Sequence, residues 1–198
     1  ETGPAKVDLA RVRARKDSLK KPQDQWVSEL MEQGFAAYTG AATFLDTHRV
    51  RVGELVLEAE RILIATGSRT AVPPIAGIED VDWIDHISAL ELTELPKSLL
   101  VVGAGAVGLE FGQIFRRFGS EVTIVDAFER ISPNSDAEAC TVLAAALEDE
   151  GIELTISVFV KSVRCDGDII ATIAPGDGSA EYEVRAERVL LASGRVPN

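Results

Sequence analysis

The stretch VVGAGAVGLE, at residues 101–110, restricts the fold of this chain more than any other part of the sequence. An apolar run that is typical of a buried strand leads into three glycines spaced as G-x-G-x-x-G, and an amphipathic helical pattern follows. Gly103 permits a tight turn, Gly105 lets the backbone approach a diphosphate, and Gly108 lets the helix pack closely on the strand. The free N–H groups at the helix N-terminus favour a phosphate. The dinucleotide-binding turn predicted in this way comprises Gly103, Ala104, Gly105, Ala106, Val107 and Gly108.

Two carboxylates follow the glycine turn. Asp126 ends the next predicted strand, where it can accept hydrogen bonds from the adenine ribose hydroxyls and would repel a 2′-phosphate. Because Ala127 and Phe128 come next and no arginine does, NAD(H) is predicted in preference to NADP(H). Glu110 lies on the first turns of the predicted helix. It is either an acid favoured by the helix dipole or a carboxylate that faces the nicotinamide, and the spacing does not decide between them.

The pattern around the turn predicts an α/β fold, with a Rossmann-like NAD(P)-binding domain that contains a parallel sheet. Strand-like runs at 96–102, 120–126 and 152–156 alternate with helical runs at 106–119 and 136–151. The first helix is expected to bury Val107, Phe111, Ile114, Phe115 and Phe118. The second is expected to begin with a capping box of Ser135 and Glu138 and to bury Ala139, Cys140, Leu143, Ala146 and Leu147. Residues 157–187 predict an antiparallel excursion before a last strand at 188–193.

The first third of the chain has a different pattern. Residues 5–33 predict two helical pieces broken at Pro22, with Gly34 as the C-terminal stop. Short alternating runs between residues 42 and 60 predict a small antiparallel meander. RILIATGS, at residues 61–68, is a continuous apolar run and predicts a buried strand.

Composition excludes several classes of function. A formal net charge of -12 makes nucleic acid and anionic lipid poor partners, and the basic run at residues 11–21 is interpreted as a solvated helix face. The chain has two cysteines and two histidines, which form no ligand-like cluster, so neither a metal site nor a disulfide scaffold is predicted. No secretory signal or membrane span is recognised, and a cytoplasmic location is expected.

Three stretches of the sequence carry a family resemblance. ILIATGSRTAVPPIAG at 62–77, LPKSLLVVGAGAVGLEFGQIFRRFGSEVTIVDAFERISP at 95–133 and VLLASGRVPN at 189–198 stand in the order found in one family of flavoenzymes. The chain thereby resembles the FAD-dependent pyridine nucleotide–disulfide oxidoreductases, with dihydrolipoamide dehydrogenase and mercuric reductase as the most similar members.

The resemblance implies roles for further residues. Glu110 would lie near the nicotinamide and the flavin, and Asp126 would hold the adenine ribose. Val160 would line the adenine side, and Gly194 would contact the nicotinamide half. The backbone of Ala65, Thr66 and Gly67 would approach FAD. No residue of the chain is assigned a catalytic role by the resemblance.

The resemblance also implies a division of the chain. Residues 1–70 would be the C-terminal part of an FAD-binding domain, residues 71–188 an inserted NAD(H)-binding domain, and residues 189–198 the strand that returns towards the FAD domain. The first G-x-G-x-x-G of the family, its C-x-x-x-x-C redox pair and its dimerisation domain are not found in the sequence. We therefore expect an internal portion of a homodimeric enzyme that passes hydride from NAD(P)H to FAD and on to a disulfide or similar acceptor. This portion alone is expected neither to hold FAD tightly nor to turn over.

Two other interpretations fit the residues. A non-catalytic module that senses NADH would need the same strand, turn and helix. A related flavoprotein without the redox disulfide, such as an NADH oxidase or a ferredoxin reductase, would share the whole pattern. The segment that would carry C-x-x-x-x-C distinguishes this last possibility from the disulfide enzymes.

Overall fold

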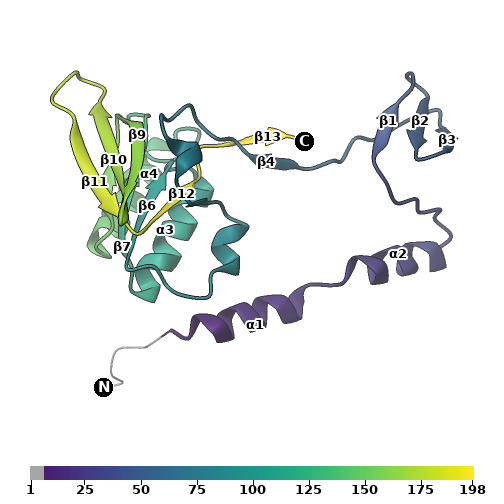
Figure 1. Cartoon of the computed structure of the whole chain (residues 1–198), viewed down its shortest axis with the longest axis horizontal. Helices are drawn as coiled ribbons and strands as arrows, with labels where there is room; N and C mark the ends of the chain where they lie inside the picture. Colours follow the sequence, from purple (N-terminus) through teal and green to yellow (C-terminus); the bar gives the residue numbers. More distant parts are fainter. Residues whose placement is uncertain (1–6) are drawn as a thin grey trace. The chain divides into compact units, whose positions relative to one another are not determined.

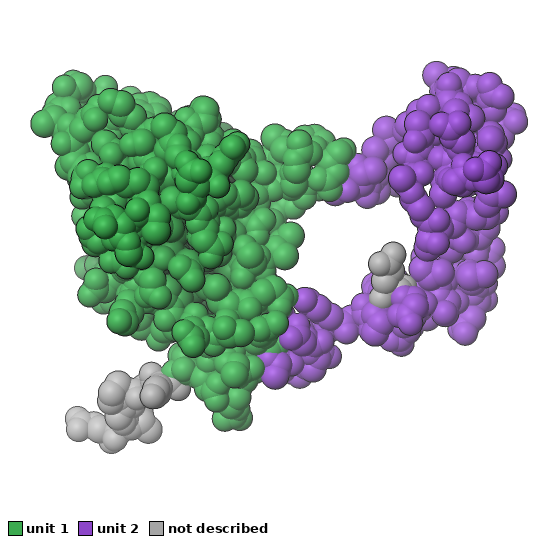
Figure 2. All heavy atoms as spheres, in the orientation of Figure 1, with its two compact units in different colours: residues 1–13, 68–198 green, residues 14–67 purple. Residues whose placement is uncertain are grey.

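The computed structural model describes residues 7–198 (Figure 1). The chain divides into two compact units, residues 14–67 and a second unit made of residues 68–198 with the residues up to 13 (Figure 2). Helix α1 (Leu9–Leu19) runs across the boundary and buries none of its residues.

A parallel sheet forms the centre of residues 68–198, as the sequence predicts, and it has five strands. Its strands stand in the order β5-β12-β6-β7-β8, and every neighbouring pair is parallel. The strands are β5 (Trp83–Ile84), β12 (Arg188–Leu191), β6 (Ser98–Val102), β7 (Glu121–Val125) and β8 (Glu153–Thr155). The edge strand β5 has two residues and carries too little periodicity to be recognised in the sequence.

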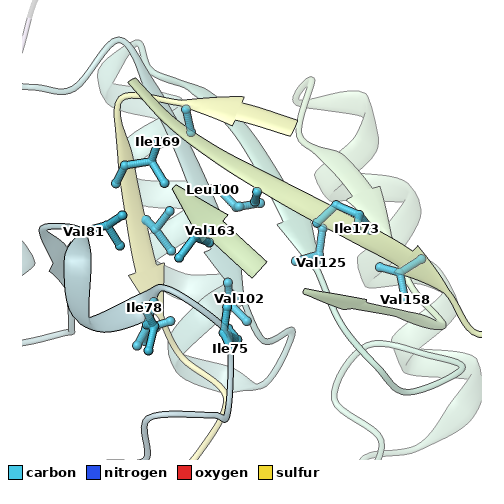
Figure 3. Close-up of a cluster of buried hydrophobic side chains, with 14 residues drawn as sticks. Ile75, Ile78, Val81, Leu100, Val102, Val125, Val158, Val163, Ile169 and Ile173 are labelled. Atoms are coloured by element: carbon cyan, nitrogen blue, oxygen red, sulfur yellow. The ribbon is translucent and has the colours of Figure 1, made fainter. Parts of the chain in front are cut away.

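The two faces of this sheet are covered by different layers. Leu99 and Val101 of β6 pack with α3 (Ala106–Phe118) and α4 (Ala137–Asp149), whereas Leu100 and Val102 point to the opposite face. That opposite face packs against an antiparallel sheet (Figure 3). Its strands are β9 (Val158–Asp166), β10 (Asp168–Pro175) and β11 (Tyr182–Ala186). Successive residues of β6 point to opposite faces of the sheet, and both faces are covered by apolar layers. The sequence of β6 is therefore continuously hydrophobic.

The buried face of α3 differs from the predicted one. It consists of Gly108, Leu109, Gly112 and Phe115, while Ile114 is 40% exposed. Val107, Phe111 and Phe118 are only partly buried. A Cβ on Gly112 would lie 2.7 Å from the Ile124 side chain, so the helix approaches the sheet most closely at its glycines. Phe115 is buried as expected, and Phe111 packs against the same core. Hydrophobic periodicity gives no weight to glycine and therefore missed the contacts of Gly108 and Gly112.

The predictions for α4 are also corrected. Asp136, not Ser135, is the N-cap residue, and its carboxylate accepts hydrogen bonds from the N–H groups of Glu138 and Ala139. Cys140 and Leu147 are buried as expected, but the other predicted core residues, Ala139, Leu143 and Ala146, are exposed. Because α4 lies on the surface of the unit, a narrow stripe of apolar side chains is enough to attach the helix to the sheet.

A two-stranded antiparallel ribbon joins the start and the end of residues 68–198. In it β4 (Ser68–Thr70) pairs with β13 (Arg195–Pro197). The two 3-10 helices of this unit are η1 (Ile78–Asp80) and η2 (Ser88–Glu91).

Residues 14–67 form secondary structure in which none of the described side chains is buried. Helix α2 (Gln23–Glu32) ends in a left-handed Gly34 (φ 87°), and the N–H of Phe35 reaches back to the carbonyl of Leu30. The predicted meander is confirmed as β1 (Ala42–Phe44), β2 (Arg49–Val52) and β3 (Leu55–Glu58).

The prediction of a buried strand at residues 61–68 is wrong. Residues 62–67 have no strand geometry, and Leu63 is 90% exposed. An apolar run becomes a strand when its backbone groups find a partner, and within residues 7–198 no strand pairs with this segment.

Candidate nucleotide-binding site

At each position of the glycine turn the structure shows what a side chain would meet. Gly103 has φ 113°, and a Cβ there would lie 2.5 Å from the carbonyl oxygen of Ala192. A Cβ on Gly108 would lie 1.8 Å from the carbonyl oxygen of Gly103. Gly105 is the N-cap of α3, has no side chain to cap the helix, and faces open space in which a Cβ would meet nothing within 4 Å. The first turn of α3 can therefore offer its N–H groups to an anion.

Asp126 follows the C-terminal end of β7 and is bonded to the glycine turn. Its Oδ2 accepts a hydrogen bond from the N–H of Ala104 at 2.5 Å, and its Oδ1 accepts one from the N–H of Phe128 at 2.8 Å. A carboxylate oxygen can accept more than one hydrogen bond, so both oxygens can still receive a ribose hydroxyl. Asp126 thus holds the turn in place as well as presenting a carboxylate, a connection that the sequence does not predict.

A cavity of about 340 Å³ opens beside the glycine turn and Asp126. Val160 of β9, which the family resemblance assigns to the adenine side, is among the residues that line it. The rest of the lining is apolar apart from Asp126 and Ser193. It comprises Pro73, Pro74, Ile75, Val102, Gly103, Val125, Ala127, Phe128, Val158, Phe159 and Ser193. An apolar cavity with one carboxylate at its edge suits a base and its ribose.

The remaining predicted residues lie in three places. Ala104, Ala106 and Val107 stand in the turn and the first turn of α3, and Glu110 is exposed on the same helix. Gly194 (φ 139°) lines a second, smaller hollow of about 30 Å³ with Val107. Ala65, Thr66 and Gly67 belong to the other compact unit and are exposed.

The sequence reasoning missed His86 and the side chain of Arg195, which line the smaller hollow with Val107 and Gly194. Both residues follow strands of the parallel sheet, His86 after β5 and Arg195 after β12. The order of the strands in the sheet would have indicated that His86 and Arg195 lie together. That order depends on contacts between distant parts of the chain, which the sequence does not reveal.

A parallel α/β sheet, with a glycine turn and an acid at the carboxyl ends of its strands, places the chain in the Rossmann-like class of proteins. The sequence signature of the pyridine nucleotide-disulphide oxidoreductases matches residues 3–198. The chain belongs to this family.

Similar proteins support the assignment. The chain is 34% identical to a mercuric reductase of Staphylococcus aureus over 200 residues, covering 100% of this chain and 36% of that protein. It is 32% identical to a dihydrolipoyl dehydrogenase of Bacillus subtilis, covering 98% of this chain and 43% of that protein. Among solved structures, the Cu(II) complex of the HOCl-induced flavoprotein disulfide reductase RclA of Escherichia coli matches with a TM-score of 0.80 and 29% identity, covering 96% of this chain and 43% of that one. The chain therefore spans less than half the length of these relatives, which are oxidoreductases.

Within residues 7–198, no helix combines the length and the apolar character needed to cross a membrane.

Proposed function

We propose that residues 71–188, with the return segment that follows them, bind NAD(H) for a flavin-dependent oxidoreductase. One observation carries the proposal: Asp126, the glycine turn and the larger cavity meet at the carboxyl ends of β6 and β7. In this arrangement the diphosphate would lie at the N-terminus of α3, where Gly105 leaves space for it. The adenosine would enter the cavity beside Val160.

Electrostatics favours NADH over NADPH in this proposal. The only charged group among the residues that line the larger cavity is the carboxylate of Asp126. A 2′-phosphate there would meet a like charge in a mostly apolar surrounding, whereas a 2′-hydroxyl would donate a hydrogen bond to it. Ala127 and Phe128, which follow in the lining, offer no compensating cation.

The proposed reaction also uses FAD, as expected for this family. Bound FAD would supply the redox chemistry between the reduced nicotinamide and a disulfide or a similar acceptor. The part assigned to this chain is to hold the dinucleotide. Glu110 on α3 and the Ala65–Thr66–Gly67 backbone are proposed to lie close to the flavin, and residues 1–70 to belong to the domain that holds it. We also propose that the enzyme acts as a homodimer. The two free cysteines, Cys140 and Cys165, agree with a reducing cytoplasm.

Titration of the purified chain with NADH and NADPH, followed by calorimetry, tests the proposal. We expect NADH to bind at least about tenfold more tightly, because a like-charge contact costs on the order of 1.4 kcal/mol or more. Asp126→Asn should weaken NADH binding by about tenfold or more, since it removes a charged acceptor of the ribose and of the Ala104 N–H. Glu129→Gln, which removes a nearby exposed carboxylate outside the cavity lining, is the matched control and should leave the affinity unchanged. Equal or tighter binding of NADPH would overturn the assignment.

A further inference from the structure

Two serines have a backbone conformation that residues with a side chain rarely adopt. Within residues 7–198, Ser132 (φ 43°) and Ser157 (φ 58°) are the residues other than glycine that have a positive φ. This left-handed conformation brings the Cβ of an L-residue too close to the following carbonyl oxygen. Such strain persists only where the surrounding contacts impose it, and it is concentrated at functional sites. The contacts of the two serines therefore indicate what their strain supports.

Ser132 is hydrogen-bonded to the glycine turn. Its N–H donates to the carbonyl of Ala104 at 2.8 Å. Its own carbonyl accepts the N–H of Ser135 at 2.8 Å and the thiol of Cys140 at 3.6 Å, so the strained residue is held from both ends. Ala104 is 1% exposed, and its N–H donates to the carboxylate of Asp126. Both polar groups of the Ala104 backbone are therefore bonded to the segment that follows β7.

The contact with Ser132 sets the direction of a neighbouring donor. The peptide between Ala104 and Gly105 is planar and trans, so the carbonyl of Ala104 and the N–H of Gly105 point in opposite directions. Because this carbonyl is turned towards Ser132, the Gly105 N–H is turned away from it. Gly105 is the N-cap of α3, and its N–H forms no hydrogen bond within residues 7–198. This N–H is therefore a donor that is oriented in advance for an anion.

Ser157 holds the other side of the nucleotide site. Its N–H donates to the carbonyl of Phe128 at 2.8 Å, and its carbonyl accepts the N–H of Gly176 at 2.8 Å. Phe128 lines the larger cavity, and its own N–H donates to the carboxylate of Asp126. The Ser157 N–H thus fixes the turn that carries Asp126 and Phe128, beside the cavity in which the adenosine is proposed to bind.

The two strained residues come from different parts of the chain and meet at one site, Ser132 before α4 and Ser157 between β8 and β9. We propose that both are positioning residues for the dinucleotide. The left-handed conformation of Ser132 orients the Gly105 N–H for a phosphate, and that of Ser157 holds the turn at residues 126–128 for the adenosine. The inference rests on the proposed function and adds to it, because it gives the two halves of the site separate supports. Each serine acts through a main-chain hydrogen bond.

Titration of the isotope-labelled chain with NADH and with adenosine, which has no phosphate, tests the proposal by NMR chemical shifts. Ser132→Val should weaken NADH binding about tenfold and leave adenosine binding unchanged. A β-branched residue disfavours positive φ, so a smaller fraction of the molecules has the donor in place. Ser157→Val should weaken the binding of both ligands by a similar factor. Ser132→Gly and Ser132→Asn, which accept positive φ, should bind NADH within about threefold of the unmodified chain.

Ser135→Val is the matched control for the hydroxyl group. It removes the same contact, between the Oγ atoms of Ser132 and Ser135 at 2.8 Å, at a residue that does not have a positive φ. This variant should bind NADH as the unmodified chain does. An equal loss of affinity in Ser132→Val and Ser135→Val would mean that the hydroxyl contact matters and the backbone conformation does not, which would overturn the inference for Ser132.

The outcomes separate this inference from the function on which it rests. If the unmodified chain binds neither NADH nor adenosine, the proposed function fails. If it binds NADH and both valine variants bind NADH equally well, the inference is overturned while the function stands. An equal loss of NADH and adenosine affinity in Ser132→Val would also overturn it, because the whole site would then be disturbed.

Amide hydrogen exchange in the unmodified chain decides the question if the valine variants do not fold. Saturating NADH should slow the exchange of the Ser132 N–H by a larger factor than saturating adenosine does, because the phosphate stabilises the turn that this N–H holds. Equal factors for the two ligands would overturn the inference.

Discussion

Residues 62–67 and residues 189–194 have nearly the same sequence, ILIATG and VLLASG, but different structures. The second run begins as β12, hydrogen-bonded to β5 on one side and to β6 on the other, with Val189 and Leu190 fully buried. The first has no strand geometry, and Leu63 and Ile64 are 90% and 65% exposed. The two units to which these runs belong differ in the same way: residues 68–198 have a buried core, whereas no described side chain in residues 14–67 is buried. An apolar run thus acquires its structure from the partners on both sides of it.

The two runs are expected to differ most in how much their leucines, Leu190 and Leu63, contribute to the free energy of unfolding. Leu190→Ala should lower the free energy of unfolding by about 2–5 kcal/mol, because it leaves a cavity between two packed layers. Leu63→Ala at the equivalent position should change it by less than about 0.5 kcal/mol. Urea denaturation followed by tryptophan fluorescence measures both, since Trp83 packs against the core of residues 68–198 and Trp26, in the other unit, is 55% exposed. A large effect of Leu63→Ala would show that the exposed run is packed in solution.

A smaller difference in the cost of substitution by alanine is expected between Gly108 and Gly53. Gly108→Ala places a methyl group against the Gly103 carbonyl, a backbone atom that cannot move without deforming the turn, and should cost about 1–3 kcal/mol. It should also abolish measurable NADH binding. Gly53→Ala in the β2–β3 turn meets open space and bears only the cost of a left-handed residue (φ 60°), about 1–2 kcal/mol, confined to its own hairpin. Denaturation and NADH titration of both variants measure the contrast, and unchanged binding in Gly108→Ala would contradict the close packing described for α3.

The smallest contrast concerns two turn carboxylates. Burial alone would raise the pKa of Asp85. Hydrogen bonds to its carboxylate outweigh this effect and hold the pKa below its ordinary value of 3.8. They come from the Ser88 N–H and hydroxyl, the Thr70 hydroxyl and the Ile87 N–H. A carboxyl with a lowered pKa in the folded state stabilises the fold above the unfolded pKa, and this contribution is lost as the pH falls through the folded pKa. Asp85→Asn should therefore cost roughly 1 kcal/mol at pH 7, with the difference from the unmodified chain shrinking below about pH 3.8.

Asp46 is the counterpart in the exposed unit. Hydrogen bonds from the His48 N–H and from the Arg49 side chain lower its pKa in the same direction, and its side chain is exposed. Asp46→Asn should leave the unfolding transition of residues 68–198 unchanged at either pH. Urea denaturation at pH 7 and pH 3 compares the two variants, and an equal effect of both would mean that burial does not decide the importance of a turn carboxylate.

Much of the fold could be predicted because it depends on neighbours in sequence. The apolar run of β6, the glycine turn, helix α3 and Asp126 together give a local pattern that a Rossmann-like fold requires. The pairing of β4 with β13 and the placement of His86 beside Arg195 could not be predicted, because these contacts join residues far apart in the chain. The buried face of α3 was predicted only in part, at Phe115, because glycine, which allows the closest approach, has no side chain to reveal its contact.

The ribbon of β4 and β13 has a consequence for how such a unit could be inherited. Ser68 pairs with Pro197, so a body of some 130 residues begins and ends at one place. A segment with adjacent ends can be spliced into a surface turn of a host protein with little strain, since the host has only to keep open the gap between two neighbouring strands. The same geometry would let a host exchange one nucleotide module for another during evolution while the rest of its architecture stayed unchanged.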